Sequence, residues 1–183
     1  MKNEALEVLF NRRSIRKFKP EQIKDEELDL VLKAGTYAPT AKGTQSPLIV
    51  VVQNPDDVKL LDRLSFQIMM KSLGLNRDGT AYYGAPTIIL VFATDRAMNE
   101  ETGIIDAANA TTNMVNAAYA VGLGSCWIHR AKEIFESAEG KALLNKWGIK
   151  EHVRGVASIA LGYPDIENPS SKERREGFVI KTK

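Results

Sequence analysis

The residues with the clearest chemical potential lie near the start of the chain, in Arg12-Arg13-Ser14-Ile15-Arg16-Lys17-Phe18. Two arginines, a hydroxyl and a third arginine within five residues could surround a phosphate, because guanidinium groups present forked donors and serine adds a short one. A solvated basic helix end is the alternative for such a run. Ile15 and Phe18 interrupt the basic residues as they would in a packed segment, which favours a ligand.

The remaining reactive residue types do not form a catalytic group. Cys126 is the only cysteine and has no obvious base beside it, so we expect a small core residue and not a nucleophile. A single cysteine also excludes an intrachain disulfide and is typical of a reducing compartment. His129 and His152 lack metal-ligand spacing, and we therefore expect no metal.

Composition narrows the possible partners. The chain has 183 residues, of which 44% are hydrophobic and 26% charged, and a formal net charge of +2. These values are typical of one globular domain spanning 1–183, and a nucleic-acid-binding protein would usually carry a larger basic excess. The apolar runs are too short to span a bilayer, and the N-terminus has no signal-peptide core. We expect a cytoplasmic protein with neither membrane nor nucleic acid as partner.

Hydrophobic spacing predicts helices alternating with strands. Asp25 is a plausible N-cap for the second helix, and Gly35 a left-handed residue that ends it. Periodicity alone suggests a doubly wound parallel sheet, yet Gly122-Leu123-Gly124 lacks the third glycine of a dinucleotide fingerprint and precedes a strand. The predicted helices cover 3–12, 25–34, 56–73, 103–121 and 132–146, and the predicted strands 48–52, 87–93, 125–129 and 153–161.

Five motifs, in order along essentially the whole chain, resemble those of the FMN-dependent nitroreductase family. The first is the Arg-Arg-Ser-x-Arg-x-Phe segment already described. The second lies directly before a predicted strand, and the other three accompany later strands. These four are Ala38-Pro39-Thr40-Ala41-Lys42-Gly43-Thr44-Gln45-Ser46-Pro47, Tyr83-Gly84-Ala85-Pro86, Gly122-Leu123-Gly124-Ser125-Cys126-Trp127-Ile128 and Gly162-Tyr163-Pro164.

The resemblance replaces the parallel sheet with an α+β fold. It implies a mixed, mainly antiparallel sheet flanked by helices, in an intertwined homodimer. Residues 165–183 would form a C-terminal extension onto the partner subunit, where the short run Phe178 to Ile180 adds a strand by exchange. The alanine-rich helix over 103–121 suits a dimer core, because small side chains permit close approach.

The resemblance also implies roles in FMN binding. Arg12 and Ser14 would hold the phosphate and ribityl chain, and Arg13 would contribute mainly through its backbone. Arg16 would reach the pyrimidine end, where reduction places negative charge at N1 and O2 that a fixed cation stabilises. Two tail residues, Lys172 and Arg174, would close over the phosphate. A solvated charge run is the alternative for the tail, and Arg175 the substitute for Arg174.

Further contacts implied by the resemblance come from two other segments. Residues Ser125, Cys126, Trp127 and Ile128 would lie alongside the flavin and offer backbone groups. The other subunit would contribute Pro39, Thr40, Ala41 and Gln45. Lys42-Gly43 departs from the family, which often has asparagine at the glycine position, so we expect a close backbone approach there in place of an asparagine contact.

The implied function is electron transfer from NADH or NADPH, via flavin N5, to a small oxidised acceptor such as a nitroaromatic or quinone. The reaction would follow a ping-pong order and would need no protein nucleophile. A flavin reductase or dehalogenase-type relative and a non-catalytic FMN carrier or sensor are the alternatives. The acceptor is not readable, because the region 62–83 that would choose it is the least diagnostic part of the chain.

Overall fold

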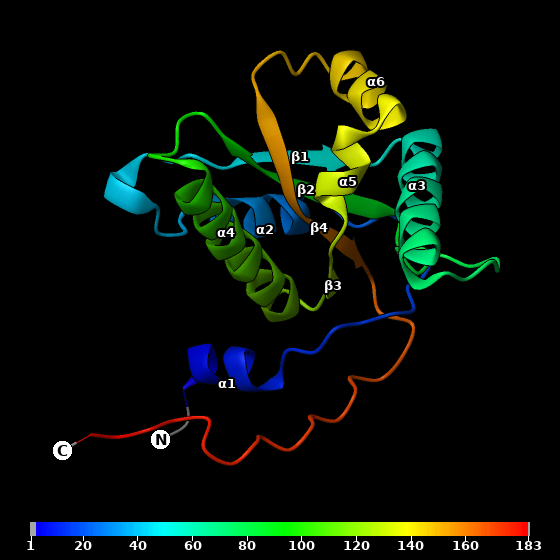
Figure 1. Ribbon diagram of the computed structural model, residues 1–183. Coiled ribbons are helices and arrows are strands. Elements are labelled where there is room, and N and C mark those ends of the chain that lie inside the picture. Colours follow the sequence, from blue (N-terminus) through cyan, green and yellow to red (C-terminus); the bar gives the residue numbers. More distant parts are fainter. Residues whose placement is uncertain (1–2, 183) are drawn as a thin grey trace.

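The computed structural model describes residues 3–182 and is organised around a four-stranded sheet (Figure 1). The strands are β1 (Leu48–Val52), β2 (Thr87–Thr94), β3 (Gly124–Ile128) and β4 (Val153–Gly162), in the order β1-β2-β4-β3 with every neighbour antiparallel. The antiparallel sheet implied by the resemblance is confirmed, and the parallel sheet suggested by periodicity is wrong. Continuous apolar runs are typical of parallel strands, but β2 is apolar because helices cover both of its faces.

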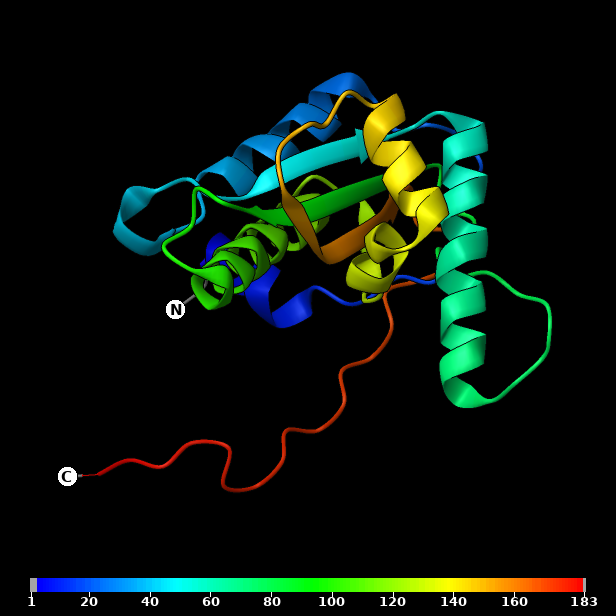
Figure 2. The same ribbon diagram turned by 45° about the horizontal axis from the view of Figure 1, so that its top comes forward.

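Helices form a layer on each face of the sheet (Figures 1 and 2). One layer contains α2 (Asp25–Thr36) and α4 (Glu100–Ala120), and the other contains α3 (Pro55–Leu73), α5 (Ala131–Glu136) and α6 (Ala138–Lys146). Both hydrophobic cores receive side chains from β2, because successive side chains of a strand point to opposite faces of the sheet. Its residues Ile88, Leu90 and Phe92 pack toward α3 and α5, whereas Ile89 and Val91 pack toward α2 and α4.

The two ends of α2 differ from what the sequence predicted. Asp25 is the first residue inside α2, so it is not the N-cap, and Lys24 precedes the helix in an extended conformation. Gly35 lies within α2 and does not end it in a left-handed conformation. A Cβ on Gly35 would lie 2.7 Å from Met114 Cγ. The glycine is therefore required by close helix packing.

The predicted helix over 132–146 is divided in two at Ser137. This residue adopts an extended conformation, with φ −73° and ψ 163°, and its side chain accepts a hydrogen bond from Gly140 N at 3.0 Å. The hydroxyl thus caps α6, in the way that serine satisfies the free N–H groups of a helix start. Gly140 permits the sharp change of direction, because a Cβ there would clash with the Ile134 carbonyl.

Two segments stand apart from the body. The first helix, α1 (Glu4–Asn11), lies beneath α4, and the residues after β4 run back below it as an extended tail (Figure 1). No residue of α1 is buried, and Phe10 is 67% exposed. The apolar tail run Phe178 to Ile180 is exposed as well. Between residues 3 and 182, no helix is both long and apolar enough to cross a membrane.

Candidate functional site

The segment after α1 pairs with the outer edge of β3 and with the chain just beyond β4. Ser14 forms a parallel bridge with Ser125 of β3, and Ile15 N donates to Ser125 O at 2.9 Å. Further along, Phe18 forms an antiparallel bridge with Pro164, just beyond β4. Ile15 and Phe18 are buried, at 5% and 7% exposure, so the packing predicted for them is confirmed.

Arg12, Ser14 and Arg16, here called the alternate row, have their side chains close to one thiol. Burial raises the pKa of Cys126, and Arg16, Ser14 and Arg12 act in the opposite direction. In an extended chain every second side chain shares a face, which explains why these three residues act together. Cys126 is only 3% exposed, as expected of a core cysteine.

Arg13 has a different environment from the alternate row. Its guanidinium donates from Nη1 to Phe10 O at 2.7 Å and to Arg12 O at 2.8 Å, which are carbonyls at the C-terminal end of α1. The positive charge is favourable there because the helix dipole leaves partial negative charge at that end. The Nη1 atom of Arg13 is thus occupied within its own chain, whereas its Nε is buried without a partner among residues 3–182.

The outer edge of β3 offers backbone groups beside the alternate row. The strand pairs with β4 on its inner side, and on its outer side the bridge to Ser14 is the only pairing in the described chain. Unpaired edge groups can bind another molecule. Ser125 and Cys126 are buried, Trp127 and Ile128 half-buried, and Trp127 Nε1 is buried with no partner among residues 3–182.

The loop before β1 lies at the opposite edge of the sheet. It contains a short turn, η1 (Ala41–Gly43), and projects from the body (Figure 2). Thr40 and Ala41 are half-buried, whereas Pro39 and Gln45 are exposed. Three strand spacings separate β1 from β3, which is about 14 Å across the sheet. One chain therefore does not bring this loop together with the alternate row.

The position of the loop depends on residues that the sequence did not single out. Asp106, Asn109 and Asn113 of α4 hydrogen-bond to the chain between Ala34 and Ser46. The feature of the sequence that could have identified them is their spacing of three and four residues, which aligns polar side chains on one face of an otherwise alanine-rich helix.

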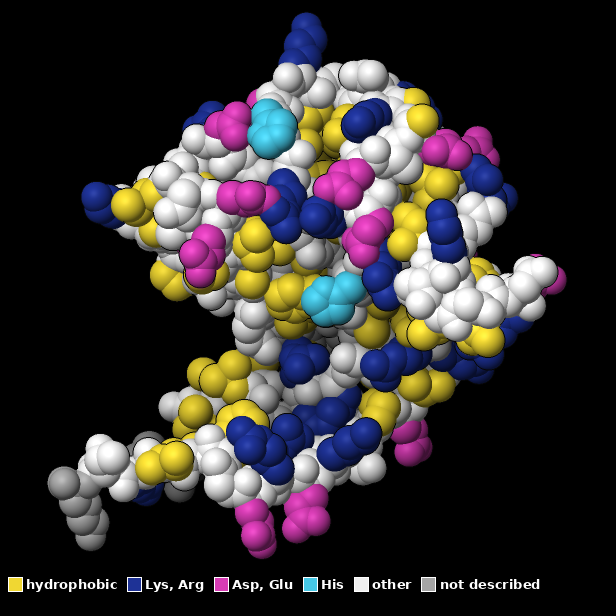
Figure 3. Space-filling view, in the orientation of Figure 1, with side chains coloured by type: hydrophobic (Ala, Val, Ile, Leu, Met, Phe, Trp, Pro, Cys, Tyr) yellow, Lys and Arg dark blue, Asp and Glu magenta, His cyan; other side chains and the backbone are white. Residues whose placement is uncertain are grey.

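The tail begins next to the alternate row. Asp165 N donates to Lys17 O at 3.0 Å, and Lys17 Nζ lies 2.7 Å from Asp165 Oδ2. Asn168 Nδ2 then donates to Asn11 O at 2.8 Å, beside Arg12. In Figure 3, Lys and Arg side chains gather below an indentation that separates the body from α1 and the tail.

The basic residues of the tail differ in their contacts. Lys172 and Arg174 are exposed. The guanidinium of Arg175 lies 5.1 Å from the centre of the Phe178 ring, within the range of a cation–π contact. Arg175 therefore has a partner within the tail.

A cavity of about 1050 Å³ lies between α3 and the residues 75–86. Met70 and Tyr82 line it, in the region expected to choose an acceptor. Tyr82 is 1% exposed, its hydroxyl lies 2.9 Å from Ser158 Oγ, and burial raises its pKa to about 12. Asp62 fixes one wall by accepting hydrogen bonds from Thr80 Oγ1 and from Ala81 and Tyr82 N–H groups, a role without a recognised motif.

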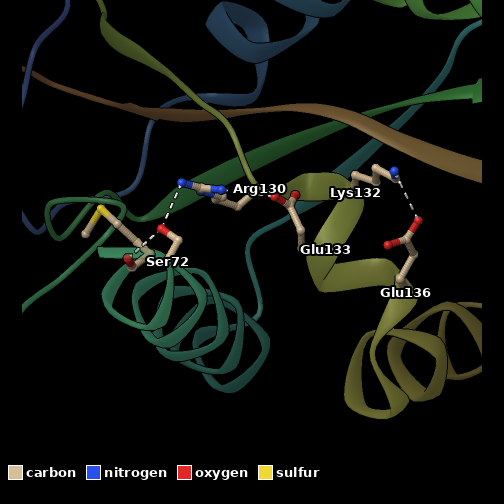
Figure 4. Close-up of polar contacts among 6 residues, drawn as sticks. Ser72, Arg130, Lys132, Glu133 and Glu136 are labelled. Carbon is tan, nitrogen blue, oxygen red and sulfur yellow. Dashed lines mark hydrogen bonds and ion pairs between the residues drawn. The ribbon is translucent and has the colours of Figure 1, made fainter. Parts of the chain in front are cut away.

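Arg130 fastens the end of β3 to α3 (Figure 4). Its guanidinium donates to Ser72 Oγ at 3.1 Å and to Glu133 Oε1 at 3.0 Å. Arg130 adopts a backbone φ of 89°, which is unfavourable for residues other than glycine. These hydrogen bonds connect the chain just after β3 to α3 and to the start of α5. Within residues 3–182, no group of three or more His, Cys, Asp or Glu side chains is arranged to hold a metal ion.

A family model described as Nitroreductase family matches residues 9–163. A protein of Archaeoglobus fulgidus with the provisional name NADH dehydrogenase/NAD(P)H nitroreductase is 29% identical, over 90% of this chain and 87% of its own. The FMN reductase (NADPH) of Bacillus subtilis is 27% identical, over 94% of this chain and 70% of its own.

Among solved structures, the FMN-bound nitroreductase of Bacteroides fragilis is similar over both complete chains. It superimposes with a TM-score of 0.85 at 28% sequence identity. The arrangement of helices and strands described above is therefore that of a known flavin-binding fold.

Proposed function

Because this chain belongs to the nitroreductase family, whose model spans residues 9–163, we propose that it binds FMN at the alternate row and β3. It is an NAD(P)H-dependent oxidoreductase. The observation that carries the proposal is the pairing of the extended segment with the outer edge of β3 at Ser14 and Ile15, in which Arg12, Ser14 and Arg16 alternate onto one face. Two cations and a hydroxyl on one face of an anchored segment fit an anionic nucleotide.

Each residue of this site has a distinct task. Arg12 and Ser14 bind the phosphate and ribityl chain, and Arg13 contributes mainly through its backbone, since its Nη1 donates to carbonyls at the end of α1. Arg16 lies at the pyrimidine end and stabilises negative charge there. When bound, FMN supplies the redox chemistry, accepting electrons from NADH or NADPH at N5 and passing them in a ping-pong sequence to a small oxidised acceptor.

The tail completes the phosphate site. The contacts of Asp165 and Asn168 fix its course along the segment that carries Arg12. Lys172 and Arg174 then close over the phosphate, while Arg175 remains with Phe178. Lys and Arg side chains are favourable partners for a phosphate, which supports this role for them.

The working unit is a homodimer, in which the partner's loop reaches the flavin. The loop with Pro39, Thr40, Ala41 and Gln45 lies at the sheet edge opposite the alternate row, so a second copy must supply it. The apolar side chains of α1, including Leu9 and Phe10, are exposed in a single chain. Their burial between subunits, and the addition of 165–183 to the partner, would favour association.

The acceptor is a nitroaromatic or quinone. The cavity beside Met70 and Tyr82 has the volume for a small aromatic molecule. Flavin reduction is the second candidate, because relatives in Bacillus subtilis and Vibrio harveyi are named FMN reductase (NADPH) and NADPH-flavin oxidoreductase. The enzyme works in the cytoplasm, as its single cysteine suggests.

The decisive experiment is the visible spectrum of purified protein without oxygen, before and after NADH and then NADPH. Flavin bands that bleach within seconds, and return on addition of a nitroaromatic or quinone, are the expected result. Return only with free FMN or riboflavin would favour flavin reduction. Bound flavin that does not bleach would favour a carrier or sensor. A colourless protein that takes up no added FMN would refute the proposal.

A further inference from the structure

We infer that Asp106 of α4 is a positioning residue for the loop that reaches the partner's flavin. This inference rests on the proposed function. Asp106 itself lies on the body of the protein and is 2% exposed. Its effect on the cofactor is exerted through the loop between Pro39 and Ser46, which it holds in one conformation.

The two oxygens of Asp106 bind two ends of the loop. Oδ1 accepts from Ala41 N at 3.0 Å, and Oδ2 accepts from Ser46 Oγ at 2.7 Å. Ser46 is fully buried, and its carbonyl accepts a further hydrogen bond from Thr94 Oγ1 at 2.7 Å. A buried carboxylate is costly unless such donors surround it. Both donors to Asp106 are uncharged groups of the loop, so the buried carboxylate is explained by its hold on the loop.

Two further residues on the same face of α4 also hold the loop, and together with Asp106 they are here called the clamp. Asn109 Nδ2 donates to Pro39 O at 3.2 Å, and Asn113 Nδ2 donates to Ala34 O at 3.1 Å. Within the loop, Gln45 N donates to Thr40 Oγ1 at 3.0 Å. The face therefore fixes both the entry to the loop and its exit into β1.

The conformation that the clamp imposes is an unfavourable one. Lys42 has a φ of 53° and Gln45 a φ of 49°, in the left-handed region that side chains other than glycine rarely adopt. Such a backbone persists only where surrounding contacts determine it, and it is often found at binding sites. The tip of this loop, at Lys42 and Gly43, is exposed within its own chain, so the structure assigns its fixed shape to a contact with a second molecule.

Asp106→Asn tests the clamp with little change in volume. An amide can accept from Ala41 N–H and donate to Ser46 Oγ, but it no longer accepts the proton of the buried Ser46 hydroxyl, and both contacts lose the charge of the carboxylate. We expect the Kd for FMN, measured by flavin fluorescence quenching, to rise at least tenfold. Asn109→Ala, which removes one half-buried contact of the same face, should raise it about threefold. The matched control is Thr112→Ala, since the Thr112 hydroxyl bonds only to Ala108 O of its own helix.

A mixed dimer distinguishes loop positioning from a general loss of stability. Subunits with Asp106→Asn and subunits with Arg12→Ala are co-expressed with different tags. Because the loop serves the partner, one site of the mixed dimer then has both defects and the other has none. We expect half of the sites to bind FMN with the affinity of the unmodified protein, whereas each parent dimer binds weakly at both sites.

The possible results separate the inference from the proposed function. Normal FMN affinity in the Asp106→Asn dimer would overturn the inference alone, as would a mixed dimer that binds no better than its parents. Unmodified protein that fails to take up FMN would overturn the proposed function together with the inference. Weak FMN binding in both parent dimers, with the affinity recovered at half of the sites in the mixed dimer, would support the inference.

Discussion

Arg12 and Arg13 are adjacent and chemically identical, yet the fold gives them different surroundings. Arg13 is bound to the carbonyls at the end of α1. Arg12 lies on the face shared with Ser14 and Arg16, where it acts on the Cys126 thiol. At this scale, alternation along an extended segment decides which arginines remain available to a ligand.

The tail arginines permit a direct comparison. We expect Arg174→Ala to raise the Kd for FMN about tenfold, because a charge-assisted contact to phosphate is lost. Arg175→Ala is the matched control and should change it less than threefold, since Arg175 contacts the Phe178 ring. Both values come from fluorescence titration at fixed salt. Equal effects of the two substitutions would contradict the assignment of Arg174 to the phosphate.

Tyr82 gives a pH-dependent prediction. Its pKa is raised by burial from 10.0 to about 12, so the unfolded chain releases the phenolic proton first as pH rises. The stabilising contribution of the neutral hydroxyl is complete below pH 10 and is lost between pH 10 and 12. At pH 8, Tyr82→Phe should lower the free energy of unfolding by about 1 kcal/mol, because the contact with Ser158 is removed.

Urea unfolding at a series of pH values measures this difference. The gap between the two proteins should shrink above pH 10 and reverse before pH 12, because ionisation of Tyr82 in the unfolded chain then outweighs the roughly 1 kcal/mol of the Ser158 contact. The exposed Tyr37→Phe serves as the control and should show no such change. A gap that stays constant across this range would show that the Tyr82 hydroxyl ionises alike in the folded and unfolded states.

At the scale of elements, two close contacts decide how the helices lie on the sheet. Gly35 lets α2 approach α4, and Ser137 separates α5 from α6. The position of α4 matters for the site, because its polar face holds the loop before β1. Helix packing and loop geometry are therefore coupled through one element.

Gly35→Ala tests this contact. Such a substitution inside a helix usually stabilises a protein, but here the new Cβ would lie 2.7 Å from Met114 Cγ. We expect the free energy of unfolding to fall by about 1–3 kcal/mol, measured with urea. In Met114→Ala protein the same substitution should cost less, because the space it needs is open. Additive effects of the two substitutions would contradict the proposed contact.

At the scale of the whole molecule, a single chain leaves apolar surface that its own fold does not cover. Phe178, Val179 and Ile180 are 68%, 70% and 86% exposed. Together with α1, they lie outside the two cores that enclose the sheet. This arrangement is understandable if the second subunit is the surface on which they pack.

Phe178→Asp tests the role of the tail in association. We expect the dimer dissociation constant from sedimentation to rise at least tenfold, or about 1.4 kcal/mol, since a buried charge would replace an apolar contact. Circular dichroism should stay unchanged, because the side chain is exposed within its own chain. Thr182→Asp adds the same charge four residues later and should have little effect. Unchanged association of the Phe178 variant would exclude an apolar tail contact in the dimer.

Most elements could be predicted from the sequence, because their physical causes are local. Strands at 48–52 and 87–94 follow from apolar runs, and the helix boundaries lie within three residues of those predicted from spacing and caps, apart from the break at Ser137. The motif around Arg12 to Phe18 likewise predicted packing of Ile15 and Phe18. Short-range patterns carry this information because hydrophobic period and turn chemistry act over a few residues.

Only the tertiary structure decided which residues come together across the sheet. Periodicity suggested parallel strands, and the antiparallel order β1-β2-β4-β3 puts the loop before β1 and the alternate row at opposite edges. The clamp at Asp106 joins residues 60 or more positions apart, which no local pattern reveals. Hydrogen bonds to two backbone carbonyls also placed the Arg13 guanidinium at the end of α1. Such long-range pairings depend on how whole layers pack, so single-sequence spacing does not determine them.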